Sequence, residues 1–338
     1  MAFEQAGGTY DSYIGSAVTE PLAAHSDPGR AAVATDALTA AAVAELATVE
    51  AEALALGPGN EPQYARTRAV TRVLARIPAF LPQAPVDSSD LVSAEAALSG
   101  RLSGPDLALA AQSAASSVLA SCPTAFETAV RLTLLPSTPL HDELMFIRSI
   151  QIFEGLYRQV AGDVAEAIKA IGAVDIESAC TLLADGAARI EATPMLYRVL
   201  TTMPRAAFAV IRDNTQGRSA IQSRWYHQVQ ALCAAPTPPE GVAGLPTPEI
   251  SGPTLQDVYA TSELAMPAAQ HRRLTTAMRR LDRAWSAMKR NHWGLTVKII
   301  GSVPGTGGTT GASYLRTSSE APLFPLLRQQ DSSVREGV

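Results

Sequence analysis

The sequence predicts an all-α protein, because three features of its 338 residues favour helices. Ala is the dominant residue, and it loses no side-chain entropy in a helix. Apolar residues recur at intervals of three and four along several long segments, whereas the strict alternation typical of a strand is almost absent. Gly and Pro cluster between these segments and mark where one helix ends and the next begins.

The N-terminal half is predicted to contain four or five amphipathic helices. A short aromatic segment comes first, and residues 16–30, which contain two prolines and a glycine, are predicted to form a linker. From residue 31 to 135 the chain is rich in Ala and Leu. Gly and Pro interrupt it at residues 57–59, 82–85 and 104–105, where we expect helices to be separated.

The C-terminal half is predicted to contain longer helices. Their expected ranges are 141–171, 174–201, 205–213, 219–233 and 254–300, with a loop rich in Pro and Gly over 235–253. The last helix has a consistent apolar stripe, formed by Leu274, Met278, Leu281, Trp285, Met288, Leu295 and Ile299. No helix is predicted after Gly301, where the chain is rich in Gly, Thr and Ser.

Composition and charge argue against several classes of protein. Hydrophobic residues make up 47% of the chain, enough for a buried core, and a net charge of −5 with no long basic run argues against a nucleic-acid partner. The three cysteines are widely spaced and suggest neither a disulfide framework nor a CxxC metal site, and the CxxCH signature of covalent haem is missing. The first residues lack the features of a signal peptide and no apolar run is long enough to span a bilayer, so we expect a cytoplasmic protein with no membrane partner.

His292 lies on the apolar stripe of the last predicted helix, four residues after Met288 and three before Leu295. One interpretation is a buried core histidine that has found a hydrogen-bond partner. The other is an axial haem ligand, since neutral imidazole commonly ligates haem iron and a porphyrin packs well against an apolar helix face.

A glycine-rich segment, residues 305–311, follows this helix with the sequence Gly-Thr-Gly-Gly-Thr-Thr-Gly. Such a loop can bind phosphate, but here the details argue against it. The Lys-Ser/Thr ending of a P-loop is absent, and Thr310 stands where a GxGxxG pattern requires Gly.

Taken together, these pieces resemble the C-terminal signature of tryptophan 2,3-dioxygenases. The matching residues are Leu281-Asp282, His292, Ile300-Gly301, Gly305 to Gly311 and Tyr314-Leu315. In that family the histidine ligates the haem iron, and the threonine of the Gly-Thr-Gly-Gly block, fourteen residues later, contacts the ammonium group of the substrate. The same spacing leads from His292 to Thr306, which lies between Gly305 and Gly307.

Three further segments resemble the same family, in the family's order. They are His141 to Ile147 with Gln151 and Glu154, then Val199 to Ser223, and Thr9-Tyr10 to Tyr13-Ile14. The first is similar to the distal-helix motif, and the second carries the arginine that binds the substrate carboxylate, here Arg212. The third is similar to a Tyr-x-x-Tyr segment that reaches into the pocket of a neighbouring subunit. The resemblance covers about residues 9–14 and 140–327, and its most specific part is the Gly-Thr-Gly-Gly block with its upstream histidine.

The resemblance implies a helical bundle of the tryptophan 2,3-dioxygenase type with an additional N-terminal helical insertion. Residues 1–15 would form an arm that contributes to a pocket, either that of its own chain or that of a neighbouring subunit. Residues 16–140 would form the insertion, whose role the sequence does not reveal, and residues 141–330 the domain that binds haem and substrate. The resemblance also implies a homo-oligomer, either a dimer or a tetramer.

The function implied is that of a haem b-dependent oxygenase that uses O₂ to oxidise the indole ring of tryptophan or a substituted tryptophan. The product expected is of the N-formylkynurenine type. His292 would ligate the iron, with Gly305 and Gly307 at the cofactor. Arg212 would pair with the substrate carboxylate and Thr306 with its ammonium group. The apolar walls would come from Phe146, Ile150, Phe208, Tyr10 and Tyr13.

The chain departs from the family at the distal side of the haem. Ile150, with Ser149 beside it, stands where the family usually has a histidine that bonds the indole N–H. These two residues are therefore the candidate catalytic positions, and a substituted tryptophan or one without a free indole N–H becomes a plausible substrate. Met288 and Lys289 replace the Trp and Arg that commonly precede the haem histidine. This divergence indicates an enzyme of specialised metabolism.

Two alternatives remain open at this point. In the first, the same haem protein inserts a single oxygen atom and is a mono-oxygenase or hydroxylase of a tryptophan or tyrosine derivative. In the second, the chain is a helical binding or scaffold protein in which His292 is only buried.

Overall fold

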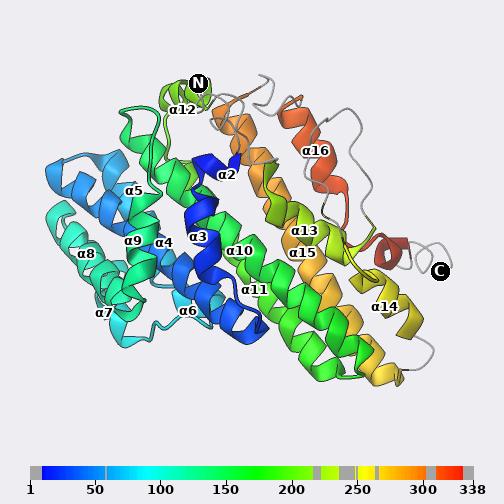
Figure 1. The fold of residues 1–338 in the computed structure, drawn as a ribbon. Helices are drawn as coiled ribbons and strands as arrows, with labels where there is room; N and C mark the ends of the chain where they lie inside the picture. Colours follow the sequence, from blue (N-terminus) through cyan, green and yellow to red (C-terminus); the bar gives the residue numbers. More distant parts are fainter. Residues whose placement is uncertain are drawn as a thin grey trace, which may run out of the picture.

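The structure, a computed structural model, confirms the all-α prediction. It describes residues 10–57, 59–215, 222–235, 248, 250–262, 266–301 and 310–329, and the regular structure in these ranges is entirely helical (Figure 1). Helices of the N-terminal half lie to one side of a layer of long helices from the C-terminal half (Figure 1).

The N-terminal half consists of one long helix surrounded by shorter ones. Their bounds are α2 (Tyr10–Tyr13), α3 (Ser16–Ala23), α4 (Pro28–Leu56), α5 (Glu61–Leu74), α6 (Ile77–Phe80), the 3-10 helix η1 (Ser89–Leu91), α7 (Val92–Ser99), α8 (Gly104–Ser121) and α9 (Thr124–Leu132). Two of the predicted interruptions separate helices, whereas Gly104 begins α8. Ser103 caps that helix by accepting a hydrogen bond from the backbone N–H of Asp106 at 3.3 Å.

The prediction of a linker over residues 16–30 is wrong, because most of this segment is helical. Pro21 lies inside α3, which packs against α4 and α9 and buries Ser16 and Ala23. Pro28 starts α4, since proline is well suited to the first turn of a helix. The side chain of Asp27 caps that turn by accepting a hydrogen bond from the backbone N–H of Arg30 at 2.8 Å.

The C-terminal half contains the longest helices. They are α10 (His141–Gly172), α11 (Ile176–Leu200), α12 (Arg205–Asn214), α13 (Arg224–Cys233), α14 (Leu255–Ser262), α15 (Ala268–Ile299) and α16 (Ala312–Glu320). The ranges predicted for α10, α11 and α12 are confirmed to within two residues. The helix predicted over 254–300 is two helices, with Pro267 directly before α15. The sequence did not predict α16.

Helices α10, α11 and α15 run alongside one another and form the centre of the molecule (Figure 1). Two of these helices contact the N-terminal half, since α10 packs against α4 and α11 packs against α5 and α6. The core face of α10 buries Met145, Ile152 and Leu156 completely, and α15 buries Trp285 and Met278.

The prediction that no apolar run is long enough to span a bilayer is wrong for α4, which is long and apolar enough by length and composition alone. However, 72% of its most apolar stretch is buried inside the protein. Its polar side chains also face inward. Asp36, Glu45 and Glu50 are buried, and each pairs with an arginine of another helix. Both observations identify α4 as a central helix of the protein core.

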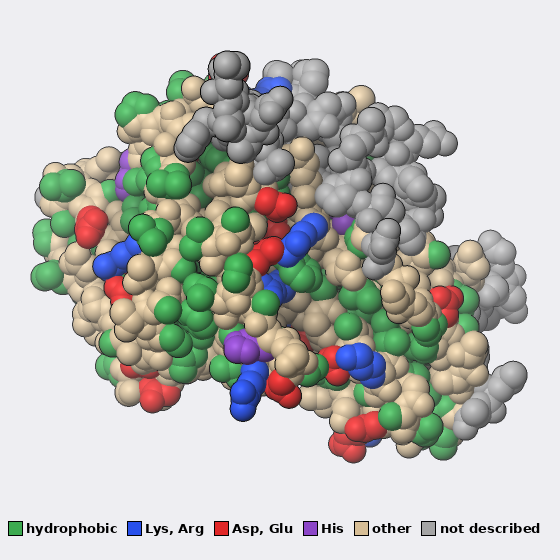
Figure 2. Space-filling model, in the orientation of Figure 1, with side chains coloured by type: hydrophobic (Ala, Val, Ile, Leu, Met, Phe, Trp, Pro, Cys, Tyr) green, Lys and Arg blue, Asp and Glu red, His purple; other side chains and the backbone are tan. Residues whose placement is uncertain are grey.

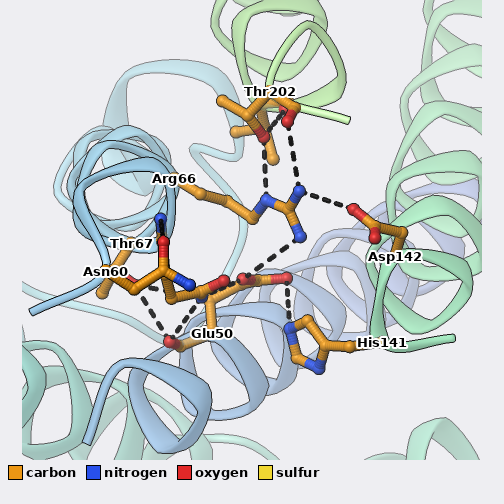
Figure 3. A network of polar contacts seen from close by, with 9 residues as sticks. Glu50, Asn60, Arg66, Thr67, His141, Asp142 and Thr202 are labelled. Atoms are coloured by element: carbon orange, nitrogen blue, oxygen red, sulfur yellow. Dashed lines mark hydrogen bonds and ion pairs between the residues drawn. The ribbon is translucent and has the colours of Figure 1, made fainter. Parts of the chain in front are cut away.

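A polar network joins the N-terminal helices to the first turn of α10 (Figure 3). The Arg66 guanidinium of α5 lies 2.6 Å from the carboxylate of Asp142, and its Nε donates to the hydroxyl of Thr202 at 2.8 Å. Glu50 of α4, which is completely buried, lies 3.2 Å from Nε2 of His141 and raises the pKa of that imidazole. The first residues of the distal-helix motif therefore hold the two halves together.

Candidate active site

His292, the predicted axial ligand, lies near the C-terminal end of α15 and is partly buried. Its ring stacks on that of Tyr197 in α11, with centroids 6.1 Å apart and planes inclined by 23°. Burial lowers the pKa of the imidazole to about 4, so the ring is neutral at physiological pH. Within the described residues, neither ring nitrogen has a hydrogen-bond partner.

A group of aromatic side chains connects His292 to the distal helix α10. Tyr197 contacts His292 on one side and Phe153 of α10 on the other, the latter at a centroid distance of 5.0 Å. Tyr157, one turn further along α10, contacts Trp285 of α15 at 5.6 Å. Ring contacts of this kind fix the two helices relative to each other.

The predicted distal side chains come together on one face of α10. Ile150 is buried in a small apolar cluster with Ile147, Tyr10 and Tyr13, and Phe146 packs against this cluster. Phe146 also contacts Phe208 of α12 edge-on, at a centroid distance of 5.7 Å. The structure thus gathers five of the predicted residues, from three separate segments of the chain, into one apolar wall.

The hydroxyl groups of the two arm tyrosines bond to carboxylates of α10. Tyr10 donates to Glu154 at 2.7 Å, and Tyr13 donates to Glu143 at 3.0 Å. Burial raises the pKa of Glu154 to about 7. Burial also acts to raise the pKa of Glu143, but hydrogen bonds from Thr138 and Ser137 outweigh it and lower that pKa. The carboxylate of Glu143 is therefore ionised at neutral pH, whereas that of Glu154 titrates near neutral pH.

Ser149 lies apart from this wall. It is completely buried and shares a face of α10 with Met145 and Ile152, which belong to the main core. In the described part of the chain its hydroxyl oxygen has no hydrogen-bond partner. Ile150, one residue later, belongs to the cluster of the arm tyrosines instead.

Arg212, the predicted carboxylate-binding residue, lies in the last turn of α12 and is half-buried. Phe208 comes four residues before it and so lies on the same side of the helix. Because Phe208 touches Phe146, the guanidinium is carried on a helix face next to the apolar wall.

Gly305, Thr306 and Gly307 lie outside the described residues, in the segment that connects α15 to α16. The segment begins after Gly301, at the end of α15, and ends before α16, which packs on α15. Lys289, one turn before His292, donates to the carbonyl oxygens of Ser318 and Ala321 at 2.7 and 2.5 Å. The lysine that replaces the family's arginine therefore holds the end of α16.

The chemistry of His292 fits the iron of haem b. A neutral imidazole with an available nitrogen is the donor that haem iron takes from histidine. In the described ranges no group of three or more His, Cys, Asp or Glu side chains converges as a site for a metal ion. A single histidine on an apolar helix is the arrangement expected for a porphyrin, whose own nitrogens supply the other ligands.

Several residues that contribute to this site were not predicted from the sequence. Tyr197 was not singled out, although it is the direct neighbour of His292. Glu143 and Glu154 were recognised only as parts of a motif. An acidic residue inside an apolar helix, such as Glu154, is a general signal of a buried polar contact, whereas Glu143 stands in the first turn of α10, where acidic residues are common.

The chain is similar to tryptophan 2,3-dioxygenases of several organisms. That of Anaeromyxobacter sp. (strain K) is 26% identical over 230 residues, covering 56% of this chain and 86% of the relative. That of Caulobacter vibrioides is 28% identical over 237 residues, covering 57% and 89%. That of Nocardioides sp. is 25% identical over 224 residues, covering 56% and 84%. No protein-family model matches the chain.

Proposed function

The chain is a divergent member of the tryptophan 2,3-dioxygenase superfamily, a group of haem-dependent oxygenases, and we propose that it oxidises the indole ring of tryptophan or a substituted tryptophan with O₂. The observation that carries this proposal is the state of His292. Its imidazole is neutral and, within the described residues, its nitrogens are not engaged in hydrogen bonds. It also stands fourteen residues before Thr306, the spacing that the family uses.

Haem b, when bound, supplies the activation of O₂, while the protein binds and orients the substrate. His292 would hold the iron, and the segment with Gly305 and Gly307 would lie at the cofactor. The product we propose is of the N-formylkynurenine type, formed by opening of the bond between C2 and C3 of the indole with insertion of both oxygen atoms.

Two residues would recognise the amino-acid part of the substrate. The Arg212 guanidinium would form a bidentate, charge-assisted pair with the carboxylate, and the Thr306 hydroxyl would bond to the ammonium group. Phe208 and Phe146 support this assignment, because they place an apolar surface one helical turn from Arg212, where an aromatic side chain can pack.

The apolar wall supports a substrate that does not need a hydrogen-bond acceptor for its indole nitrogen. Ile150 has no polar atom in its side chain, and both arm tyrosines give their hydroxyl hydrogens to carboxylates of α10. An unsubstituted indole N–H that faces Ile150, at the position of the family's histidine, would lose its hydrogen bond to water without replacement by that side chain. We therefore propose a tryptophan with an additional apolar group on the indole, such as an N-methyl group, and a role in specialised metabolism.

The test is aerobic turnover of the purified, reduced haem protein with tryptophan and with 1-methyltryptophan under ¹⁸O₂. Mass spectrometry should show a product that has gained two labelled oxygen atoms, with higher turnover for the methylated substrate. A gain of one oxygen atom would instead establish the alternative of a mono-oxygenase. If no indole amino acid is oxidised, the proposal is wrong.

A further inference from the structure

Arg66 of α5 is a buried arginine of the N-terminal half whose hydrogen bonds, within the described residues, all reach the C-terminal half. It is 5% exposed. Its Nε donates to the hydroxyl oxygen of Thr202 at 2.8 Å, and its Nη2 donates to the carbonyl oxygen of the same residue at 3.2 Å. Nη2 also donates to the carboxylate of Asp142 at 2.6 Å. One rigid guanidinium plane therefore joins the start of α10 to the turn between α11 and α12 (Figure 3).

Glu50 of α4 holds this guanidinium in place. Its carboxylate is completely buried, lies 4.0 Å from Nη1 of Arg66, and accepts a hydrogen bond from Gln63 at 2.6 Å. The face of the N-terminal helices visible on the left of Figure 2 carries only scattered charged side chains, so this half places a charged pair in its interior although its visible surface is weakly charged. Separating such a pair is strongly unfavourable, because each charge would be left buried without its partner.

The turn that Arg66 contacts leads directly into α12. The carbonyl groups at the end of a helix have no partners within it, and basic side chains can supply them. Here a second cation takes part, since Nζ of Lys298 in α15 donates to the carbonyl oxygen of Thr201 at 3.0 Å. Lys298 lies six residues after His292. The end of α11 is therefore bound to α5 on one side and to the helix of the candidate haem ligand on the other.

Helix α12 has little buried surface of its own. The structure describes all ten of its residues, and Ile211 is the only buried one. Phe208 adds an edge-on contact to Phe146 of α10. Because burial of apolar side chains is the main force that holds a helix against its neighbours, the position of α12 depends strongly on the turn before it. Arg212 lies in the last turn of this weakly held helix.

We propose that Arg66 is a positioning residue for Arg212, and that fixing α12 against α10 is a role of the inserted region. Asp142 stands four residues before Phe146, and Thr202 stands in the turn that leads to α12. By bonding to both, Arg66 sets the distance between the apolar wall and the helix that carries Arg212. The inference rests on the proposed function for what Arg212 binds, whereas the placement of α12 does not depend on it.

The first test is amide hydrogen exchange of α12, which requires neither substrate nor turnover. Arg66→Lys keeps a positive charge beside Glu50, but a single ammonium group cannot reproduce the two-sided geometry of the guanidinium. We expect exchange in α12 to become about tenfold faster. The control is Arg68→Lys on the same helix, because Arg68 donates to three carbonyl groups at the C-terminal end of α7 instead. Unchanged exchange in α12 of the Arg66→Lys variant would overturn the inference.

A milder pair of variants gives the same answer if Arg66→Lys does not fold. Thr202→Val keeps the shape of the side chain and removes the hydroxyl that accepts from Arg66. The matched control is Thr201→Val, since each of these hydroxyls also donates within its own helix, to Val199 and to Arg198 respectively. We expect exchange in α12 to be about fivefold faster in Thr202→Val than in Thr201→Val. Equal rates would contradict the role of Arg66.

A kinetic test shows whether Arg66 acts through Arg212. Arg66→Lys should lower kcat/KM for the indole amino acid about tenfold, mainly through KM. In an Arg212→Leu background the same substitution should change kcat/KM less than about twofold, because no guanidinium is left to position. Equal fold-changes in the two backgrounds would contradict positioning of Arg212. If the wild type oxidises no indole amino acid, the proposed function is wrong, and the exchange rates of α12 still decide whether Arg66 places that helix.

Discussion

The two sides of the candidate site are built in different ways. On the side of α15, the resemblance to the family depends on one histidine and its spacing to a glycine-rich segment. His292 stands at that spacing. On the side of α10, the arm, the end of α9 and α12 all meet the helix, and Ile150 replaces the histidine usual in the family. The family's spacing is therefore retained at His292, whereas the sequence has diverged at Ile150.

The two sides also differ in the charge of their buried titratable groups. Burial lowers the pKa of His292 to about 4 and keeps that side neutral. The arm side buries two carboxylates and supplies each with a hydroxyl donor. A neutral histidine is suited to the cofactor that we propose for the α15 side, whereas the α10 side places polar contacts beneath an apolar surface.

The largest effect is expected for Arg212→Leu, which tests whether the divergent side still recognises an amino acid. Loss of a charge-assisted pair with the substrate carboxylate removes about 3 kcal/mol of binding, so kcat/KM should fall about 100-fold. Steady-state kinetics would measure it, with Arg205→Leu as the control, because Arg205 is exposed in the first turn of the same helix. Equal effects of the two substitutions would show that Arg212 does not bind the substrate carboxylate.

The next effect concerns Glu154 and the pH dependence of stability. Because burial raises its pKa from the ordinary value of 4.5 to about 7 in the folded chain, the unfolded chain releases this proton first as pH rises. The contribution of Glu154 to the free energy of unfolding is therefore fully present below pH 4.5 and declines up to about pH 7, by about 3 kcal/mol.

Denaturant unfolding at several pH values would measure this decline. The acidic neighbours Asp11 and Glu20 add to the raised pKa, whereas the hydrogen bond from Tyr10 opposes it. Glu154→Gln should abolish this part of the pH dependence, and Glu166→Gln, at a more exposed site on the same helix, should not. A wild-type profile that is unchanged in Glu154→Gln would contradict the assignment.

A smaller effect is expected for Ile150→His, which makes the distal side resemble that of the family. The new imidazole can accept a hydrogen bond from an indole N–H, an interaction of about 1 kcal/mol. The ratio of kcat/KM for tryptophan to that for 1-methyltryptophan should rise about fivefold. Ile150→Leu, which adds no polar atom, should leave the ratio unchanged, and a similar rise in both variants would show that shape rather than hydrogen bonding sets the preference.

The smallest effect is expected for Ser149→Ala. Because its hydroxyl oxygen is buried without a partner among the described residues, removing it should change the free energy of unfolding by no more than about 0.5 kcal/mol. Turnover should also be unchanged, since Ser149 faces the core and not the wall of Ile150. A large loss of turnover would contradict this expectation and would support Ser149 as a catalytic residue, as its position in the motif predicted.

The sequence predicted most of what depends on local pattern. The bounds of α10 and the course of α15 followed from apolar spacing, and the position of His292 followed from the motif. Helix α3 was missed because Pro21 and the Pro-Gly pair at 28–29 also occur in linkers, and only packing against α4 and α9 shows that they lie in helices.

Other features depend on contacts that no local pattern records. Helix α16 is rich in Ser and Thr and was missed, although Lys289 bonds to two of its terminal carbonyl groups. The pairing of Tyr13 with Glu143 and of Tyr10 with Glu154 joins residues 130 and 144 positions apart. Such pairs emerge only from the folded chain, since their residue types are common and their spacing carries no signal.

The most direct test of the central claim is the optical spectrum of His292→Ala during titration with haem. We expect the wild-type protein and the control His25→Ala, a substitution of an exposed histidine, to bind one equivalent of haem with a Soret band. The His292→Ala variant should bind haem at least tenfold more weakly and lose the spectrum of a histidine-ligated iron. An unchanged spectrum and affinity in His292→Ala would contradict the account.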